Sequence, residues 1–227
     1  IEIEFAVNMY NPPEIQGEFC LLQIKPMVVG GLKESVYLIE NKKEDILCRS
    51  EIVLGDGITD SIYNIIYVDF DAFDRSLTRN IAKEIEIFNR QLGANNPYLL
   101  IGPGRWGTAD PWLGIPVNWK QISHAQTIVE LGIDELNPEP SFGSHFFQNV
   151  TSLRIGYFTL QHIDKGGEID IEWLNSQPVK QATKFIRWIL LEDPLHIRID
   201  GSTGEGVILK PKLALTEVMD EGESSGI

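Results

Sequence analysis

The sequence predicts an α/β or α+β fold, in which a mixed β-sheet with a few helices follows a separate β-hairpin. Short β-rich runs recur along the chain, and one segment has strong helical periodicity. Hydrophobic residues make up 43% of the 227 residues, which is enough for one large core or for one core and a small satellite. We therefore expect a folded globular protein with a mixed sheet.

The hairpin is predicted at the start of the chain. Ile3, Phe5 and Val7 alternate with polar or small residues over residues 1–8, which is the period of a strand. A second alternating run covers residues 19–27 after a long connection. A lone hairpin is not stable in water, so we expect it to pack on the rest of this chain or on a sheet outside it.

The next elements are two strands and a helix. Strands are expected at 35–39 and 65–70, with a turn at 54–60. Asp74 is a plausible N-cap, and Gly93 occupies the position of a C′ glycine. Apolar residues recur between them at helical spacing: Leu77, Ile81, Ile85, Phe88 and Leu92.

A buried strand at 98–101 leads into residues 102–119, which are too rich in Gly and Pro for regular structure and form the main candidate functional surface. A short helix capped by Ser141 or Ser144 is expected further on. The remaining segments predict strands, the last three separated by turns at EDP and GSTGE. These strands are expected at 127–133, 155–160, 184–191, 196–201 and 206–211.

Composition excludes several classes of protein. The net charge of -14 argues against a nucleic-acid partner, because binding to a phosphate backbone needs clustered Lys and Arg. No apolar run approaches the length that crosses a bilayer. Cys20 and Cys48 show no disulfide or metal-binding pattern, so reduced thiols and a cytoplasmic location are expected. The acidic tail formed by residues 216–227 is predicted to be disordered.

The segments I-E-I-E-F-A-V and L-L-Q-I-K-P-M resemble the closing strands of the ATP-grasp domain of phosphoenolpyruvate synthases and pyruvate phosphate dikinases. The family pattern is Glu-aromatic, then Leu-Gln-x-Arg-Pro. The resemblance implies that Glu4 and Gln23 hold Mg²⁺ against the phosphates of ATP. Lys25 stands where the family usually has arginine, and lysine offers a point charge instead of a planar fork.

Four further motifs resemble a region of a subset of synthase-like proteins: S-E-I-V-L-G-D-G, L-L-I-G-P-G-R-W-G, D-P-W-L-G-I-P-V and S-F-G-S-H-F-F-Q-N. The resemblance covers roughly 170 residues. It implies closing ATP-grasp strands at 1–30, a C-terminal accessory domain at 31–215 and the tail at 216–227. The hairpin would then come from an incomplete ATP-grasp domain.

The resemblance also implies a function for the longer parent protein, which would transfer phosphate from ATP toward pyruvate with Mg²⁺. This chain alone is expected to be inactive and to bind no cofactor tightly. Its expected partners are the N-terminal domains of the same protein and a small-molecule phosphate ligand, with no nucleic acid and no membrane. The alternatives are a module that binds a small anion and a structural domain that couples other domains.

Gly102, Gly104 and Gly107 fit the spacing of a dinucleotide-binding loop, with Glu130 as the ribose acid. That hypothesis requires a helix at the third glycine, which the following prolines forbid. An anion pocket formed by Gly102, Gly104, Arg105 and backbone amides is a second interpretation.

A structural role for this segment is favoured over both binding hypotheses. The tryptophans Trp106, Trp112 and Trp119 would then cover the end of the sheet. Burial of Arg105 and the tryptophans would favour structure, whereas an open pocket around them would favour a ligand.

Two histidines are weaker candidates. His124 lies in S-H-A-Q-T-I-V, which resembles the phosphohistidine stretch of the family's swivelling domain, but the Gly-Gly-x-Thr turn that precedes it there is missing. His145 near a helix start would donate to a phosphate, or would cap its own backbone, which is the commoner outcome. No pattern of a serine hydrolase or a zinc enzyme is present.

Overall fold

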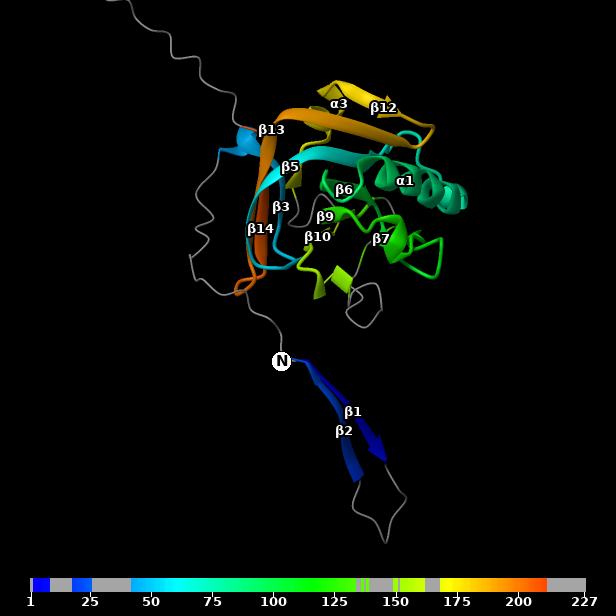
Figure 1. Cartoon of the computed structure of the whole chain (residues 1–227), viewed down its shortest axis with the longest axis vertical. Coiled ribbons are helices and arrows are strands. Elements are labelled where there is room, and N and C mark those ends of the chain that lie inside the picture. Colours follow the sequence, from blue (N-terminus) through cyan, green and yellow to red (C-terminus); the bar gives the residue numbers. More distant parts are fainter. Residues whose placement is uncertain are drawn as a thin grey trace, which may run out of the picture. The chain divides into compact units, whose positions relative to one another are not determined.

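The structure is a computed structural model that describes residues 2–8, 18–25, 42–133, 136, 138, 149–150, 152–161 and 168–211. The chain divides into two compact units, residues 1–33 and residues 34–227 (Figure 1). The predicted combination of a β-hairpin and a mixed sheet with few helices is confirmed.

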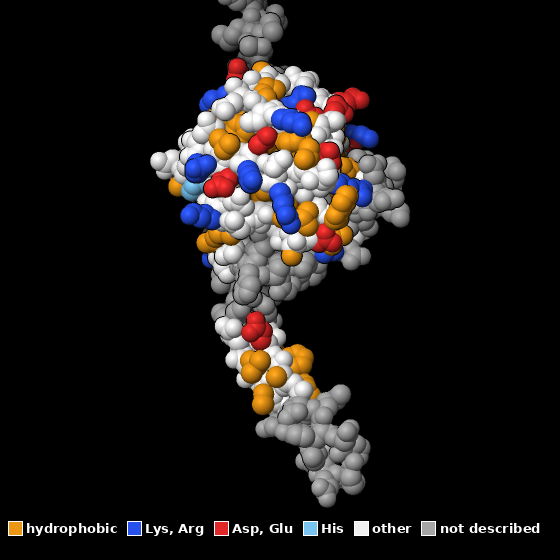
Figure 2. Space-filling model, turned by 90° about the vertical axis from the view of Figure 1, so that its right-hand side faces the viewer, with side chains coloured by type: hydrophobic (Ala, Val, Ile, Leu, Met, Phe, Trp, Pro, Cys, Tyr) orange, Lys and Arg blue, Asp and Glu red, His pale blue; other side chains and the backbone are white. Residues whose placement is uncertain are grey.

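The first unit contains β1 (Glu2–Asn8) and β2 (Glu18–Lys25), which pair antiparallel. The register places Glu2 opposite Lys25 and Glu4 opposite Gln23, with an irregularity directly after Glu4. Apolar side chains alternate with these polar positions, and they appear in orange on the hairpin in Figure 2. They are all about half exposed or more: Ile3, Phe5, Val7, Phe19, Leu21, Leu22 and Ile24.

The second unit is built on a ten-stranded mixed sheet with the order β11-β3-β14-β13-β5-β6-β9-β10-β4, and β12 pairs with β13 (Figure 1). The sheet strands are β3 (Ile46–Ser50), β4 (Val53–Leu54), β5 (Gly57–Val68), β6 (Tyr98–Pro103), β9 (Ala125–Leu131), β10 (Gly156–Leu160), β11 (Glu168–Ile169), β12 (Val179–Ala182), β13 (Ile186–Asp200) and β14 (Glu205–Leu209). The helices are η1 (Lys43–Asp45), η2 (Arg75–Leu77), α1 (Thr78–Leu92), η3 (Trp119–Gln121) and α3 (Ile171–Ser176).

Four neighbouring strands, β5, β6, β9 and β10, run parallel, and the other pairs of the sheet are antiparallel. The sheet curls, because β4 follows β3 within three residues yet pairs with β10 at the far end of the strand order. The Ser50 hydroxyl donates to the carbonyl of Thr159 at 2.6 Å and closes this curl. Because β5, β6, β9 and β10 are parallel, their carboxyl ends lie together at one edge of the sheet.

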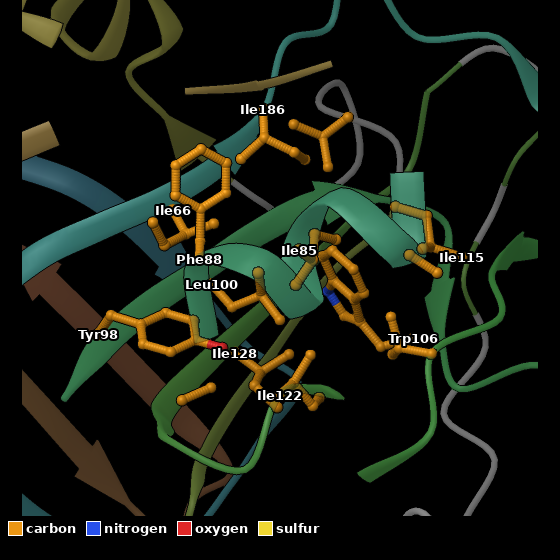
Figure 3. Packing of buried hydrophobic residues seen from close by; sticks show 14 of the residues in the cluster. Ile66, Ile85, Phe88, Tyr98, Leu100, Trp106, Ile115, Ile122, Ile128 and Ile186 are labelled. Carbon is orange, nitrogen blue, oxygen red and sulfur yellow. The ribbon is translucent and has the colours of Figure 1, made fainter. Parts of the chain in front are cut away.

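Two hydrophobic clusters lie on the two faces of the sheet. One contains the apolar side of α1 and the sheet residues beneath it, among them Ile85, Phe88, Leu100, Trp106 and Ile128 (Figure 3). The other fills the concave side of the curl. Helix α1 is amphipathic as the sequence predicted, and its buried positions include all the predicted periodic residues from Ile81 to Leu92.

The ends of the helix differ slightly from the prediction. Asp74 accepts a hydrogen bond from the Ser76 N–H, but it caps the 3₁₀ turn η2, which leads into α1. Gly93 ends α1 as its C-cap with a φ of 64°, which favours glycine, but its ψ of -177° differs from the αL conformation expected at C′.

Two predicted turns were wrong. Only Gly55 and Asp56 separate β4 from β5, so most of the predicted turn at 54–60 is strand. The EDP segment does not divide two strands, because β13 runs unbroken from 186 to 200. Its pairing with β5 instead shifts register between Leu190 and Leu195, which accommodates Pro194 without ending the strand.

The segment 102–119 also contains more regular structure than predicted. The strands β7 (Arg105–Trp106) and β8 (Gly114–Ile115) form a parallel pair, and η3 follows them. The sequence did not predict β3, β11, β12 or α3. The predictions for 35–39, for Ser141 and Ser144 and for 216–227 lie outside the described residues, whereas 149–150 and 152 are helical.

None of the described helices combines the length and the apolar character needed to cross a bilayer. Cys20 is exposed and Cys48 is buried, and both are free thiols.

Candidate functional site

The carboxyl ends of the parallel strands bring the predicted glycine-rich segment next to a buried acid. Gly102 at the end of β6 lies opposite Glu130 of β9, and Glu130 lies opposite Thr159 of β10. In open sheets of this kind, the carboxyl ends of parallel strands are the usual location of ligand sites. We therefore define the carboxyl-end site as Gly102, Arg105, Glu130, Tyr157 and Thr159. Trp106 contacts this site at Gly102 and Glu130.

Close backbone contacts shape the loop that carries Arg105. Gly104 has a φ of 69°, and a Cβ there would lie 2.8 Å from the Cα of Gly114. A Cβ on Gly114 would overlap the backbone of Arg105. The glycines thus allow β7 and β8 to pair, as the close-packing interpretation of this segment expected.

Trp106 connects this loop to the sheet at three points. A Cβ on Gly102 would lie 2.5 Å from Cζ2 of Trp106, so the indole ring occupies the space above that glycine. The indole Nε1 donates to the carbonyl of Val129 at 3.0 Å. The main-chain N–H of Trp106 donates to Oε1 of Glu130 at 2.8 Å.

Glu130 is 1% exposed, which is unusual for a carboxylic acid. Its Oε2 is buried and has no hydrogen-bond partner among the residues that the structure describes. Burial raises the pKa of Glu130 to about 7, while the Tyr157 hydroxyl, the Trp106 N–H and the charge of Arg105 act in the opposite direction. The carboxyl group therefore titrates near neutral pH, as many acids in catalytic and ligand-binding sites do.

Three neighbours complete the site. Tyr157 is buried, and its pKa is raised by burial and then by the charge of Glu130. Arg105 is partly exposed, and its charge acts on both Glu130 and Tyr157. Thr159 is 2% exposed, and its Oγ1, like Oε2 of Glu130, has no hydrogen-bond partner within the described part of the chain.

The backbone amides of residues 104–107 all have acceptors inside the protein. Gly104 donates to Leu131, Arg105 to Leu113 and Gly107 to Ile115. Trp106 donates to Glu130, as described above. An anion at Arg105 would therefore need side-chain donors instead of the backbone amides that the sequence suggested.

The hairpin forms a separate candidate site. Glu4 and Gln23, which the resemblance implies are Mg²⁺ ligands, are direct cross-strand partners. Lys25 lies two residues from Gln23 and pairs with Glu2. Directly opposite residues of an antiparallel pair have Cβ atoms about 5 Å apart, so Glu4 and Gln23 lie next to each other. The described residues contain no group of three or more His, Cys, Asp or Glu suited to a metal ion.

The other sequence candidates have different surroundings. No helix begins at Gly107, in agreement with the rejection of a dinucleotide-binding loop. Trp106 is buried, Trp119 packs against the α1 cluster and Trp112 is 62% exposed. The main chain of His124 donates to Asn89, and the imidazole is partly buried. His145 lies outside the described residues.

The sequence interpretation considered Glu130 only as a ribose acid, and it missed Tyr157 and Thr159. The available signal was an acid inside the apolar run T-I-V-E-L of a predicted buried strand.

Comparisons of the chain with protein-family models, with curated proteins and with solved structures gave no match.

Proposed function

We propose that this chain is the C-terminal part of an ATP-dependent phosphotransferase that resembles phosphoenolpyruvate synthase. In this proposal the hairpin closes an ATP-grasp domain, and residues 31–215 form an accessory domain. The register of the hairpin carries the proposal, because it places Glu4 directly opposite Gln23. A carboxylate and an amide oxygen side by side are suitable Mg²⁺ ligands.

Each residue of the hairpin has a distinct role in this proposal. Glu4 and Gln23 position Mg²⁺ against the phosphates, and Lys25 offsets charge that develops during phosphoryl transfer. The apolar face of the hairpin packs against the remainder of the ATP-grasp domain, which supplies the other phosphate-binding groups. The chain alone is catalytically silent because those groups lie elsewhere in the longer protein.

The test compares two acid substitutions in the longer protein. Glu4→Gln should reduce Mg²⁺ affinity and ATP-dependent phosphorylation of pyruvate by at least about tenfold. Glu18→Gln serves as the control, because Glu18 pairs with Asn8 at the far end of the same hairpin. Equal activity of the Glu4→Gln protein and the unmodified protein would refute the metal-binding role.

A second candidate function is favoured by the carboxyl-end site. The charge of Arg105 acts on a buried acid and a buried tyrosine at an edge where ligands commonly bind. We propose that residues 34–227 bind a small oxyanion at this edge and so regulate or couple the other domains. Calorimetric titration with phosphoenolpyruvate should show saturable binding that Arg105→Ala abolishes.

A further inference from the structure

Two buried polar atoms at the carboxyl-end site have no hydrogen-bond partner among the described residues, and they belong to the neighbouring strands β9 and β10. Glu130 and Thr159 are register partners in the parallel pair of β9 and β10, so their side chains share a face of the sheet. Adjacent strands lie about 4.8 Å apart, which brings the two side chains within reach of one ligand group. Among the described residues, neither Oε2 of Glu130 nor Oγ1 of Thr159 has a hydrogen-bond partner.

Unsatisfied buried polar atoms cost free energy, so a pair of them at one point of the fold calls for an explanation. The backbone of Thr159 is well anchored, because its N–H donates to Ile52 and its carbonyl accepts from Ser50. The carboxyl of Glu130 is held through Oε1 by Trp106. Both side chains therefore present their remaining polar atom from a fixed position.

The charges around these atoms favour an anionic ligand. The titratable or charged groups described as acting on Glu130 are Arg105 of β7 and Tyr157 of β10. Protonation of Glu130 removes one negative charge from beside Arg105, so it makes these surroundings more favourable for an anion. A protonated Glu130 can also donate a hydrogen bond from Oε2, since Oε1 already accepts one from Trp106.

We propose that Glu130 and Thr159 bind an oxygen of a small oxyanion, a carboxylate or a phosphate, and that binding requires Glu130 in its protonated form. The Glu130 carboxyl and the Thr159 hydroxyl each donate to the ligand, and the charge of Arg105 offsets the ligand's charge. One proton is taken up from solvent and held on Oε2 for each anion bound above neutral pH. This inference rests on the proposed oxyanion-binding function and identifies its proton linkage.

The test titrates the chain with acetate and with sulfate at pH 6 and pH 8. Both probes keep their charge over this range, and they represent carboxylates and tetrahedral oxyanions respectively. The expected result is affinity about tenfold lower at pH 8 than at pH 6, because one proton must be bound. Calorimetry in two buffers of different ionisation enthalpy should show uptake of up to one proton for each anion at pH 8.

Glu130→Gln removes the titratable proton and keeps an acceptor for the Trp106 N–H. The amide retains an oxygen for the Trp106 N–H and places a permanent donor near the position of Oε2. The variant should bind the preferred probe with the same affinity at pH 6 and pH 8. Binding to the unmodified chain that is independent of pH would overturn the inference and leave the oxyanion-binding function in place. Absence of binding for both probes would overturn both.

Thr159→Val removes a hydroxyl that no described residue uses, so it should leave the folded chain at least as stable as before. Its affinity for the anion should fall by about tenfold, the loss expected for one hydrogen bond to a charged group. Thr127→Val is the matched control, because Thr127 is also buried but pairs with Gly156 and Leu99 on the opposite face. Unchanged affinity in Thr159→Val would refute the ligand role of this hydroxyl.

Discussion

The main-chain N–H of Trp106 donates to the carboxyl group of Glu130 at 2.8 Å. This bond joins the glycine-rich loop to the end of β9. The indole of Trp106 lies against Gly102 at the end of the neighbouring strand β6. The position of the loop and the protonation of the buried acid are consequently coupled. A change at either residue should be detectable at the other.

Glu130 should make the stability of the chain depend on pH. Burial raises its pKa in the folded chain to about 7 from an ordinary value of 4.5, so the folded state binds the proton more tightly than the unfolded state. Its contribution is fully present below pH 4.5 and is lost as the pH rises through about 7. The loss in the free energy of unfolding is about 3 kcal/mol.

Glu130→Gln should remove this dependence, giving a stability similar to the unmodified chain at pH 5 and greater at pH 8. Urea unfolding at the two pH values measures the effect. Glu192→Gln, at an exposed position of β13, provides the control and should change little at either pH. A Glu130→Gln chain that loses the same stability as the unmodified chain between pH 5 and pH 8 would assign the dependence to other groups.

Gly104 should tolerate substitution less well than Gly93, although the two have φ values of 69° and 64°. A Cβ at Gly93 meets nothing within 4 Å, whereas one at Gly104 meets the backbone of Leu113 and Gly114. Gly93→Ala should cost about 1 to 3 kcal/mol from backbone conformation alone, because its ψ of -177° adds to the positive φ. Gly104→Ala should cost at least about 1 kcal/mol more, because β7 and β8 must separate. Equal losses in thermal unfolding would argue against tight pairing of these strands.

Asn89 should be the most sensitive polar position of α1. Its side chain accepts hydrogen bonds from the hydroxyl of Tyr98 and the main chain of His124, and it donates to the carbonyl of Lys120. Asn89→Ala should reduce the free energy of unfolding by about 2 to 3 kcal/mol, because these buried groups lose their partner. Asn80→Ala, at an exposed position of the same helix, should change it by less than about 0.5 kcal/mol.

The substitution Lys25→Arg tests the one departure from the family pattern in the hairpin. In the proposed phosphotransferase, arginine should support ATP turnover at least as well as lysine, because its planar fork binds phosphate in two places. Lys25→Met should reduce turnover by at least about tenfold, since it removes the charge. Steady-state kinetics of the longer protein measure both. Full activity of Lys25→Met would remove Lys25 from the phosphate-binding role.

Local patterns predicted the hairpin and α1 well. The alternation around Phe5 and the helical spacing from Ile81 to Leu92 each depend on neighbours in the sequence, and both elements are present. The continuous strand β13 was not predictable in this way. A proline normally disfavours the interior of a strand, but β13 pairs with β5 on both sides of Pro194 and with β14 from His196 onward.

The carboxyl-end site was predicted in part. The glycine motif drew attention to Gly102, Gly104 and Arg105 because their residue types are locally unusual. Tyr157 and Thr159 are ordinary strand residues, and they join the site only through the register between β9 and β10. The raised pKa of Glu130 likewise results from burial in the folded chain, which the local sequence pattern does not predict.

The most direct test of the carboxyl-end site is a pH titration of the Trp106 amide by ¹H–¹⁵N NMR. The amide proton donates to Glu130, so its chemical shift reports the charge on that carboxyl group. We predict a titration midpoint near pH 7, which Glu130→Gln abolishes. A midpoint below pH 5 would show an ordinary solvated carboxylate, and would contradict the buried, proton-linked acid on which the site depends.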